Sequence, residues 1–286
     1  MKTLQRILLA TSIALMPLCV QGQESRRWTL EEEGHISWKP QKTEVHHDHI
    51  EISGKTVSVV LRYGVENGKF VLNKSMVWPM LRTIPNNTHA SLMRRYNWDV
   101  LDMVNINGRA LTAEQVESIQ LKGMLKVTSN YDEGRRGQWK VIREYFPSTT
   151  KPALVECYQI VNTGQKELAV ELPEVNQKSF TDPKKGVTGS FCIETSTDKS
   201  GYFIVKPGET LQFGAVLTAY KEGENAPTFD VLQEKAQRQA LVDELMGKLV
   251  LETPDPVIDR MFAFSKIRGC ESIYETKGGP MHGPGG

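Results

Sequence analysis

Three histidines and an aspartate stand together near the start of the chain, in the run His46-His47-Asp48-His49. Alternate residues of a strand point to the same side, so His47 and His49 would share one face and offer two nitrogen ligands to a metal ion. The chain has no second His or Cys pair at ligand spacing. We therefore interpret the run as an exposed polar entry to a strand, and we predict neither a metal nor another cofactor.

A polar segment with two prolines, residues 76–96 (MVWPMLRTIPNNTHASLMRRY), is the stronger candidate for binding. Long polar loops on a rigid scaffold often carry binding residues. A tryptophan stacks on the face of a sugar ring, and Arg and Asn side chains hydrogen-bond to hydroxyl groups. The alternative is a loop that covers one edge of the fold with its arginines in solvent. The candidate substrate-binding residues in this segment are Trp78, Arg82, Asn87 and His89.

Known catalytic motifs are missing from the sequence. It contains no Gly-x-Ser-x-Gly elbow, no His-Glu-x-x-His, no Cys-x-x-Cys and no dinucleotide fingerprint. Asp and Glu are numerous, but no two of them stand out as a catalytic pair. We assign no catalytic residue from the motifs.

Charge and composition limit the classes of partner. The 286 residues carry 35 Lys and Arg against 34 Asp and Glu, which gives no electrostatic basis for binding nucleic acid. Residues 1–22 are typical of a secretory signal, because two basic residues precede an apolar stretch too short to span a bilayer. We expect cleavage after Gly22, a secreted or periplasmic protein, and no membrane span.

Cleavage there leaves three cysteines, Cys157, Cys192 and Cys270. Cys157 and Cys192 lie in apolar, strand-like surroundings, where cysteine packs as a small apolar residue. A disulfide between these two is the alternative in an oxidising compartment.

Short β segments dominate from Glu44 to Lys221, rich in Val, Ile, Thr and aromatic residues and separated by turn residues. About ten strands with regular turns and little helical periodicity predict a mainly β fold, a large antiparallel sandwich. The strands are expected at residues 55–65, 70–72, 98–106, 116–130, 138–146, 153–162, 167–172, 187–195, 202–205 and 210–220.

The period changes after the last strand. Apolar residues recur every three to four positions over residues 228–250, which predicts an amphipathic helix. Asp255 and Pro256 suit the cap and the first turn of a second helix, expected to run to about Glu275. A glycine-rich stretch, residues 278–286 (GGPMHGPGG), follows. Out of context, it is typical of a disordered end.

Three segments carry a resemblance to a known family: Ser75–Arg82 (SMVWPMLR), Thr253–Phe262 (TPDPVIDRMF) and Thr276–Gly286 (TKGGPMHGPGG). With the secreted sandwich and the linker helix, they resemble the six-hairpin glycosidases, especially secreted Bacteroidetes members, whose catalytic domain is an (α/α)6 toroid. The resemblance implies a carbohydrate substrate and a first toroid helix from Asp255 to about Glu275. It implies that the glycine-rich segment enters the active site, so Lys277 and His282 join the candidate substrate-binding residues. The catalytic carboxylates would lie deeper in the toroid than this chain reaches.

Length then decides between a whole enzyme and part of one. Twelve helices of roughly 12 residues with connections of about 5 need on the order of 200 residues, whereas 33 residues follow Thr253. We therefore expect a signal peptide (1–22), a sandwich (23–225), a linker helix (226–252) and the start of a truncated toroid (253–286), inactive by itself. A stand-alone carbohydrate-binding sandwich, or a structural periplasmic domain that docks on a partner, are the alternatives. The sequence does not specify the oligomeric state.

Overall fold

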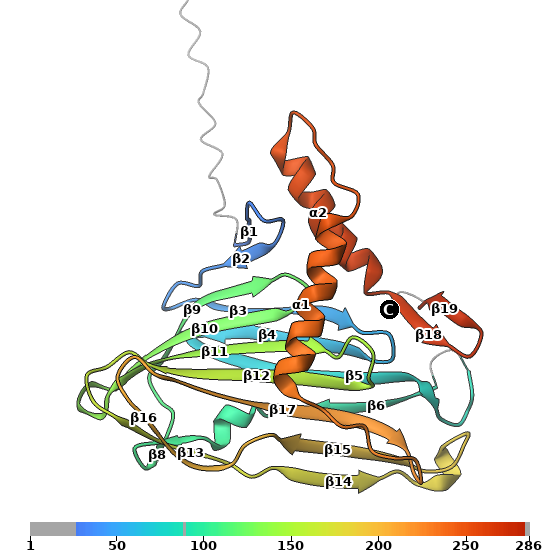
Figure 1. Ribbon diagram of the computed structural model, residues 1–286, viewed down its shortest axis with the longest axis horizontal. Helices are drawn as coiled ribbons and strands as arrows, with labels where there is room; N and C mark the ends of the chain where they lie inside the picture. Colours follow the sequence, from blue (N-terminus) through green and yellow to red (C-terminus); the bar gives the residue numbers. More distant parts are fainter. Residues whose placement is uncertain (1–26, 88–89, 284–286) are drawn as a thin grey trace, which may run out of the picture.

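The computed structural model describes residues 27–87 and 90–283 (Figure 1). The predicted signal peptide with its cleavage site after Gly22, and the candidate binding residue His89, lie outside the described residues. The architecture is mainly β, as predicted: antiparallel sheets form a sandwich, and two helices follow it.

One layer is a nine-stranded sheet in which neighbouring strands run antiparallel. Its central strands are long and carry the apolar runs from which the sequence predicted them. Their order across the sheet is β1 (Thr29–Leu30), β2 (Ile36–Trp38), β9 (Glu114–Leu121), β10 (Leu125–Asp132), β11 (Gln138–Pro147), β12 (Ala153–Asn162), β17 (Thr210–Lys221), β15 (Phe191–Thr197) and β14 (Asn176–Phe180).

The facing layer is a four-stranded meander, and its inward side chains pack on the large sheet to form the main core. Its strands are β3 (Val45–Ser53), β4 (Ser58–Glu66), β5 (Lys69–Arg82) and β6 (Ser91–Tyr96). A third, small sheet contains β16 (Gly201–Val205), β13 (Leu168–Leu172), β7 (Asn105–Ile106) and β8 (Arg109–Ala110). Short 3-10 turns lie at Val100–Met103, Gly134–Arg136 and Pro183–Lys185.

Helix α1 (Val231–Gly247) crosses the outer face of the large sheet over β11, β12 and β17 (Figure 1). This cover explains why β12 is buried almost continuously rather than at alternate positions. Near the start of α1, Gly214 of β17 faces Val231, and an added Cβ would lie 2.5 Å from Val231 Cγ1. Glycine is therefore the residue that lets the helix reach the sheet.

Helix α2 (Pro256–Cys270) begins as predicted, because Asp255 Oδ1 accepts a hydrogen bond from Val257 N at 2.9 Å and Pro256 stands in the first turn. It ends earlier than expected. The expected continuation to Glu275 was wrong. β18 (Ile273–Thr276) pairs with β19 (Gly279–His282), which belongs to the glycine-rich stretch, and the two strands form a hairpin. β18 lies against the turn between β3 and β4, where Glu275 N donates to Lys55 O at 2.8 Å.

Buried Arg238 of α1 joins these parts. Its guanidinium donates to Gly123 O at 2.7 and 2.9 Å and to Ser53 O at 3.2 Å, and it pairs with Glu271 beyond the end of α2. One side chain thus ties together α1, the turn between β9 and β10, the end of β3 and the end of α2.

Three other predictions need correction. Residues 76–96 are not a long loop: β5 continues to Arg82 and β6 begins at Ser91. Residues 98–106 form a 3-10 turn and a two-residue strand, and residues 116–130 form two strands, with Gly123 at a left-handed φ of 67° in the turn between them.

The alternative disulfide was also wrong. Cys157 and Cys192 are free thiols, because β17 lies between their strands in the sheet. Among the described residues, no helix is both long and apolar enough to cross a membrane.

Candidate functional site

Trp78 does not offer its ring to a ligand. Its side chain is fully buried in the core, and its indole nitrogen donates to Pro152 O at 2.8 Å. The predicted role as a sugar-stacking platform is therefore wrong in this structure.

Arg82 and Asn87 lie in the real connection between β5 and β6. Arg82 donates to the side chains of Asn86 at 2.9 Å and Ser91 at 3.0 Å, so its guanidinium holds the ends of this connection together. Asn87 is exposed, and its carbonyl accepts from Ala90 N at 3.1 Å. These contacts give Arg82 a positioning role within the connection, and its predicted role in substrate binding stays a prediction, as does that of Asn87.

Lys277 and His282 both lie on the β18–β19 hairpin and are exposed. His282 Nδ1 is 3.0 Å from Ser272 Oγ. The hairpin therefore presents these two residues at the surface, and their predicted contact with a substrate stays a prediction.

The histidine run forms part of β3. His47 Nε2 lies 2.9 Å from Glu66 Oε1 on the neighbouring strand. The described residues include no group of three His, Cys, Asp or Glu side chains placed to hold a metal ion.

A network of charged and phenolic side chains lies between the two layers, and the sequence did not reveal it. Lys74 Nζ of β5 is 2.6 Å from Glu156 Oε1 of β12, and both side chains are fully buried. Tyr158 Oη lies 2.6 Å from Glu156 Oε2 and 2.9 Å from Asp99 Oδ1, so its single proton is held between two carboxylates. Tyr145 donates its phenolic proton to the other oxygen of Asp99.

Burial and charge act in opposite directions on these groups. Burial raises the pKa of Glu156, and the charge of Lys74 only partly offsets it. Burial also acts to raise the pKa of Asp99, but the charges of Arg143 and Lys74 and a hydrogen bond from Tyr145 outweigh it, so this pKa lies below its usual value. Asp99 is thus held as an anion between two cations.

Arg143 connects the network to an open cleft. Its guanidinium donates to Ser129 Oγ at 2.9 Å and to Tyr131 Oη at 3.1 Å, and it lies 2.8 Å from Glu114 Oε1. Glu114 Oε2 in turn accepts from Phe70 N at 3.2 Å. Arg143, Tyr131 and Glu114 therefore form a fixed polar floor.

The cleft above this floor has a volume of about 1050 Å³ and lies between the turn end of the β4–β5 hairpin and the segment from Asn97 to Glu114. Most of its rim is polar and exposed. The rim residues include Arg62, Glu66, Asn67, Lys69, Asn73, Asn97, Asp102 and Thr112.

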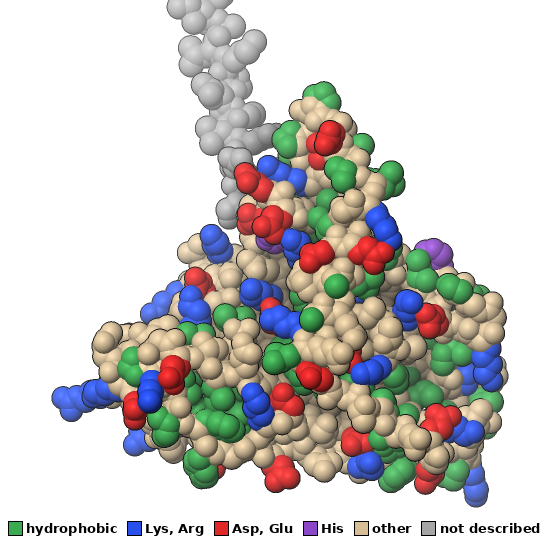
Figure 2. All heavy atoms as spheres, viewed as in Figure 1, with side chains coloured by type: hydrophobic (Ala, Val, Ile, Leu, Met, Phe, Trp, Pro, Cys, Tyr) green, Lys and Arg blue, Asp and Glu red, His purple; other side chains and the backbone are tan. Residues whose placement is uncertain are grey.

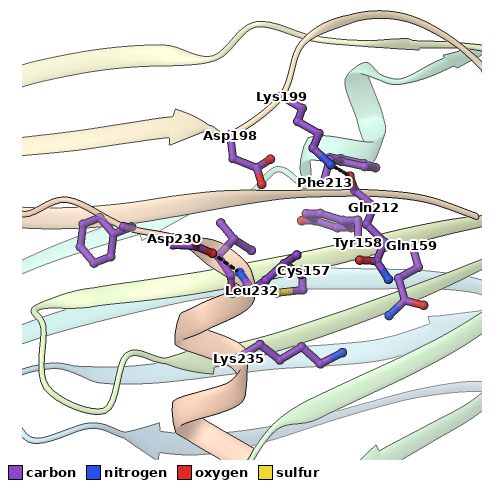
Figure 3. Close-up of a pocket in the computed structure, with 12 residues that line it drawn as sticks. Cys157, Tyr158, Gln159, Asp198, Lys199, Gln212, Phe213, Asp230, Leu232 and Lys235 are labelled. Atoms are coloured by element: carbon purple, nitrogen blue, oxygen red, sulfur yellow. Dashed lines mark hydrogen bonds between the residues drawn. The ribbon is translucent and has the colours of Figure 1, made fainter.

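A smaller cavity of about 290 Å³ lies where the start of α1 meets the large sheet (Figure 3). Its charged groups have partners within the fold. Asp198 accepts from Gly214 N at 2.7 Å, Lys199 donates to Gln212 O at 2.6 Å, Asp230 caps α1, and Lys235 pairs with Glu144. We interpret this cavity as part of the junction between α1 and the sheet.

The end of α1 and the start of α2 project from the sandwich (Figure 1) and carry exposed apolar side chains. Hydrophobic side chains gather on this projection in the space-filling view (Figure 2). Exposed fractions reach 77% for Leu249 and 57% for Met261. We call this group the apolar tip; it consists of Leu249, Val250, Val257, Ile258 and Met261.

No protein-family model and no curated protein matches this chain. Among solved structures, a chain described as "Putative kojibiose phosphorylase from human microbiome" superposes with a TM-score of 0.51 at 7% sequence identity. The superposition covers 87% of this chain and 43% of that chain. At this identity the likeness shows a shared fold, and this chain spans less than half the length of the protein it matches.

Proposed function

We propose that this chain is the accessory β-sandwich of a secreted enzyme that acts on the glycosidic bonds of poly- or oligosaccharides. A helical catalytic domain would begin with α2. The observation that carries the proposal is the fold match, which covers 87% of this chain but only 43% of a protein named as a phosphorylase of a sugar. The segments Thr253–Phe262 and Thr276–Gly286, with their resemblance to six-hairpin glycosidases, support the same arrangement.

The apolar tip supports the position of the proposed helical domain. Ile267 and Phe264 bury one side of α2 against the rest of the fold, while Ile258 and Met261 of the same helix face solvent. Contiguous exposed apolar side chains commonly mark an interaction surface. A toroid helix would cover this side with its next helices, so the tip is where we place the contact.

The reaction class rests on the resemblance and on the matched structure. The six-hairpin resemblance implies that the catalytic carboxylates lie in the toroid, so we place bond cleavage in the helical domain. The six-hairpin resemblance favours hydrolysis, and the name of the matched structure favours phosphorolysis. Phosphate dependence separates the two, since phosphorolysis releases a sugar phosphate and hydrolysis releases the free sugar.

The experiment compares this chain with the protein encoded when the reading frame is followed past Gly286. Both are assayed on α- and β-linked disaccharides and oligosaccharides, with and without inorganic phosphate. We expect cleavage by the longer protein and none by residues 23–286. The proposal is refuted if no reading frame beyond the codon for Gly286 encodes a helical region. It is also refuted if the longer protein does not cleave glycosidic bonds.

A further inference from the structure

The large cleft lies away from the β18–β19 hairpin. The hairpin contacts the chain at Ser53 and Lys55, where β3 ends and β4 is about to begin. The cleft includes Glu66 and Lys69, at the far end of β4. Nine residues of strand separate the two ends, which corresponds to about 30 Å. The cleft therefore lies at the opposite end of β4 from the β18–β19 hairpin.

A free strand edge opens into this cleft. The pairing of β6 with β5 starts at Lys74 and Tyr96, so the stretch from Lys69 to Asn73 pairs with β4 on one side only. Phe70 N points away from β4, because it donates to the side chain of Glu114. Backbone groups of this stretch thus face the cleft in positions that the sheet fixes.

The charges around the cleft nearly cancel. Three cationic side chains, those of Arg62, Lys69 and Arg143, line it together with four carboxylates. The carboxylates are those of Glu66, Asp99, Asp102 and Glu114. A polyanion would meet four like charges, and an apolar ligand would strip water from the polar rim without replacing its hydrogen bonds.

A neutral ligand with many hydroxyl groups fits this lining best. Each hydroxyl both donates and accepts, which matches alternating guanidinium, amide and carboxylate groups. The Asn67, Asn73 and Asn97 amides offer both functions on one side chain. The volume of about 1050 Å³ lies just above the usual range for small-molecule sites, which leaves room for several sugar units.

We propose that this cleft binds a neutral oligosaccharide, with Arg62 and Asn73 on its rim as direct contacts and the Arg143–Glu114 pair as its fixed floor. The inference goes beyond the proposed function, because it concerns binding by this chain alone and holds whether or not a helical domain follows.

The test uses residues 23–286 and a panel of neutral oligosaccharides of two to six hexose or pentose units, with uronic-acid oligosaccharides and an extended peptide as additional probes. Binding is measured by titration calorimetry. The cleft variant is R62A/N73A, whose side chains are exposed, and the matched control is R135A/N176A, which removes an exposed Arg and an exposed Asn elsewhere. Thermal unfolding establishes that both variants fold.

We expect at least one neutral oligosaccharide to bind, with affinity reduced tenfold or more in R62A/N73A and unchanged in R135A/N176A. Absence of neutral-oligosaccharide binding across the panel would overturn the proposal. Equal affinity in both variants would also overturn it, as would selective binding of the uronic acids or the peptide. The experiment measures binding and not cleavage. Failure of this binding proposal can therefore be distinguished from failure of the proposed function.

Discussion

Lys74 and Glu156 form an ion pair across the middle of the sandwich, with Nζ and Oε1 2.6 Å apart and both side chains fully buried. The two residues belong to β5 and β12, the facing layers of the fold. Lys74 Nζ also lies 4.8 Å from the centre of the Trp98 ring. The pair thus fixes how the two sheets face each other, at a point where an unpaired charge would have no water to solvate it.

Breaking this pair should destabilise the fold strongly. K74M leaves the Glu156 carboxylate buried without its cation, and the free energy of unfolding should fall by about 3–5 kcal/mol. The double variant K74M/E156M should recover most of that loss, because no charge remains unpaired. Urea unfolding of the wild type, K74M, E156M and the double variant measures the effect.

Lys248, which pairs with Glu244 at the surface, is the control position, and K248M should leave stability unchanged. A small loss in K74M, or a double variant as unstable as the single one, would contradict this account.

The contact between α1 and Gly214 gives a second prediction. In G214A the new methyl group would lie 2.5 Å from Val231 Cγ1 and 2.7 Å from Glu156 O, so the helix must move. Overpacking of this kind costs about 1–3 kcal/mol. G247A at the end of α1 meets no atom within 4 Å and should be neutral or slightly stabilising. Equal melting temperatures for the two variants would show that α1 does not rest on Gly214.

Glu271 should make stability depend on pH. Burial raises its pKa to about 7, with Arg238 and Arg268 only partly opposing the rise, against 4.5 for an ordinary Glu. The folded state then holds the proton more tightly than the unfolded state. Its contribution to stability is fully present below about pH 4.5 and is lost as the pH rises through 7, with a magnitude on the order of 3 kcal/mol.

The measurement is the free energy of unfolding between pH 4.5 and 8 for the wild type and E271Q, which cannot titrate. We expect the difference between the two curves to change across this interval, with the wild type losing stability relative to the variant as the pH rises. Parallel curves would show that Glu271 stays ionised throughout, held by its two arginines.

The thiols should differ sharply in reactivity. Cys157 and Cys192 are buried and out of reach of a reagent in the folded protein, and burial also raises the pKa of the Cys157 thiol to about 12. Cys270 is only half-buried at the end of α2. In residues 23–286, Ellman's reagent should modify one thiol quickly and the other two only after denaturation, and C270S should abolish the fast phase. Rapid modification of all three would contradict the packing of α1 on the sheet.

The sequence predicted the elements whose signals are local. The boundaries of β12 match the expected Ala153–Asn162, and the start of α2 follows from Asp255 and Pro256. The loop predicted for the segment from Met76 to Tyr96 was wrong, because Pro79 lies within a strand. Pro79 is tolerated there because the register with β6 shifts between Trp78 and Arg82, which leaves its position outside the regular ladder.

The candidate site could not be predicted from the spacing of its residues in the sequence. Lys74, Asp99, Glu114, Arg143 and Glu156 lie far apart in the chain, and only the pairing of the strands brings them together. One signal was present: Glu156 interrupts the largely apolar strand β12, which indicates a charge that needs a buried partner. The partner itself depends on how the two sheets face each other, and no local pattern encodes that.

Hydrogen exchange along α2 tests the central claim most directly. The amides from Val257 to Cys270 are compared in residues 23–286 and in the protein extended past Gly286. If the apolar tip is the contact with a helical catalytic domain, the amides from Val257 to Met261 exchange quickly in the short chain and become protected by at least tenfold in the long one. Equal exchange in both proteins would contradict the claim that α2 begins that domain.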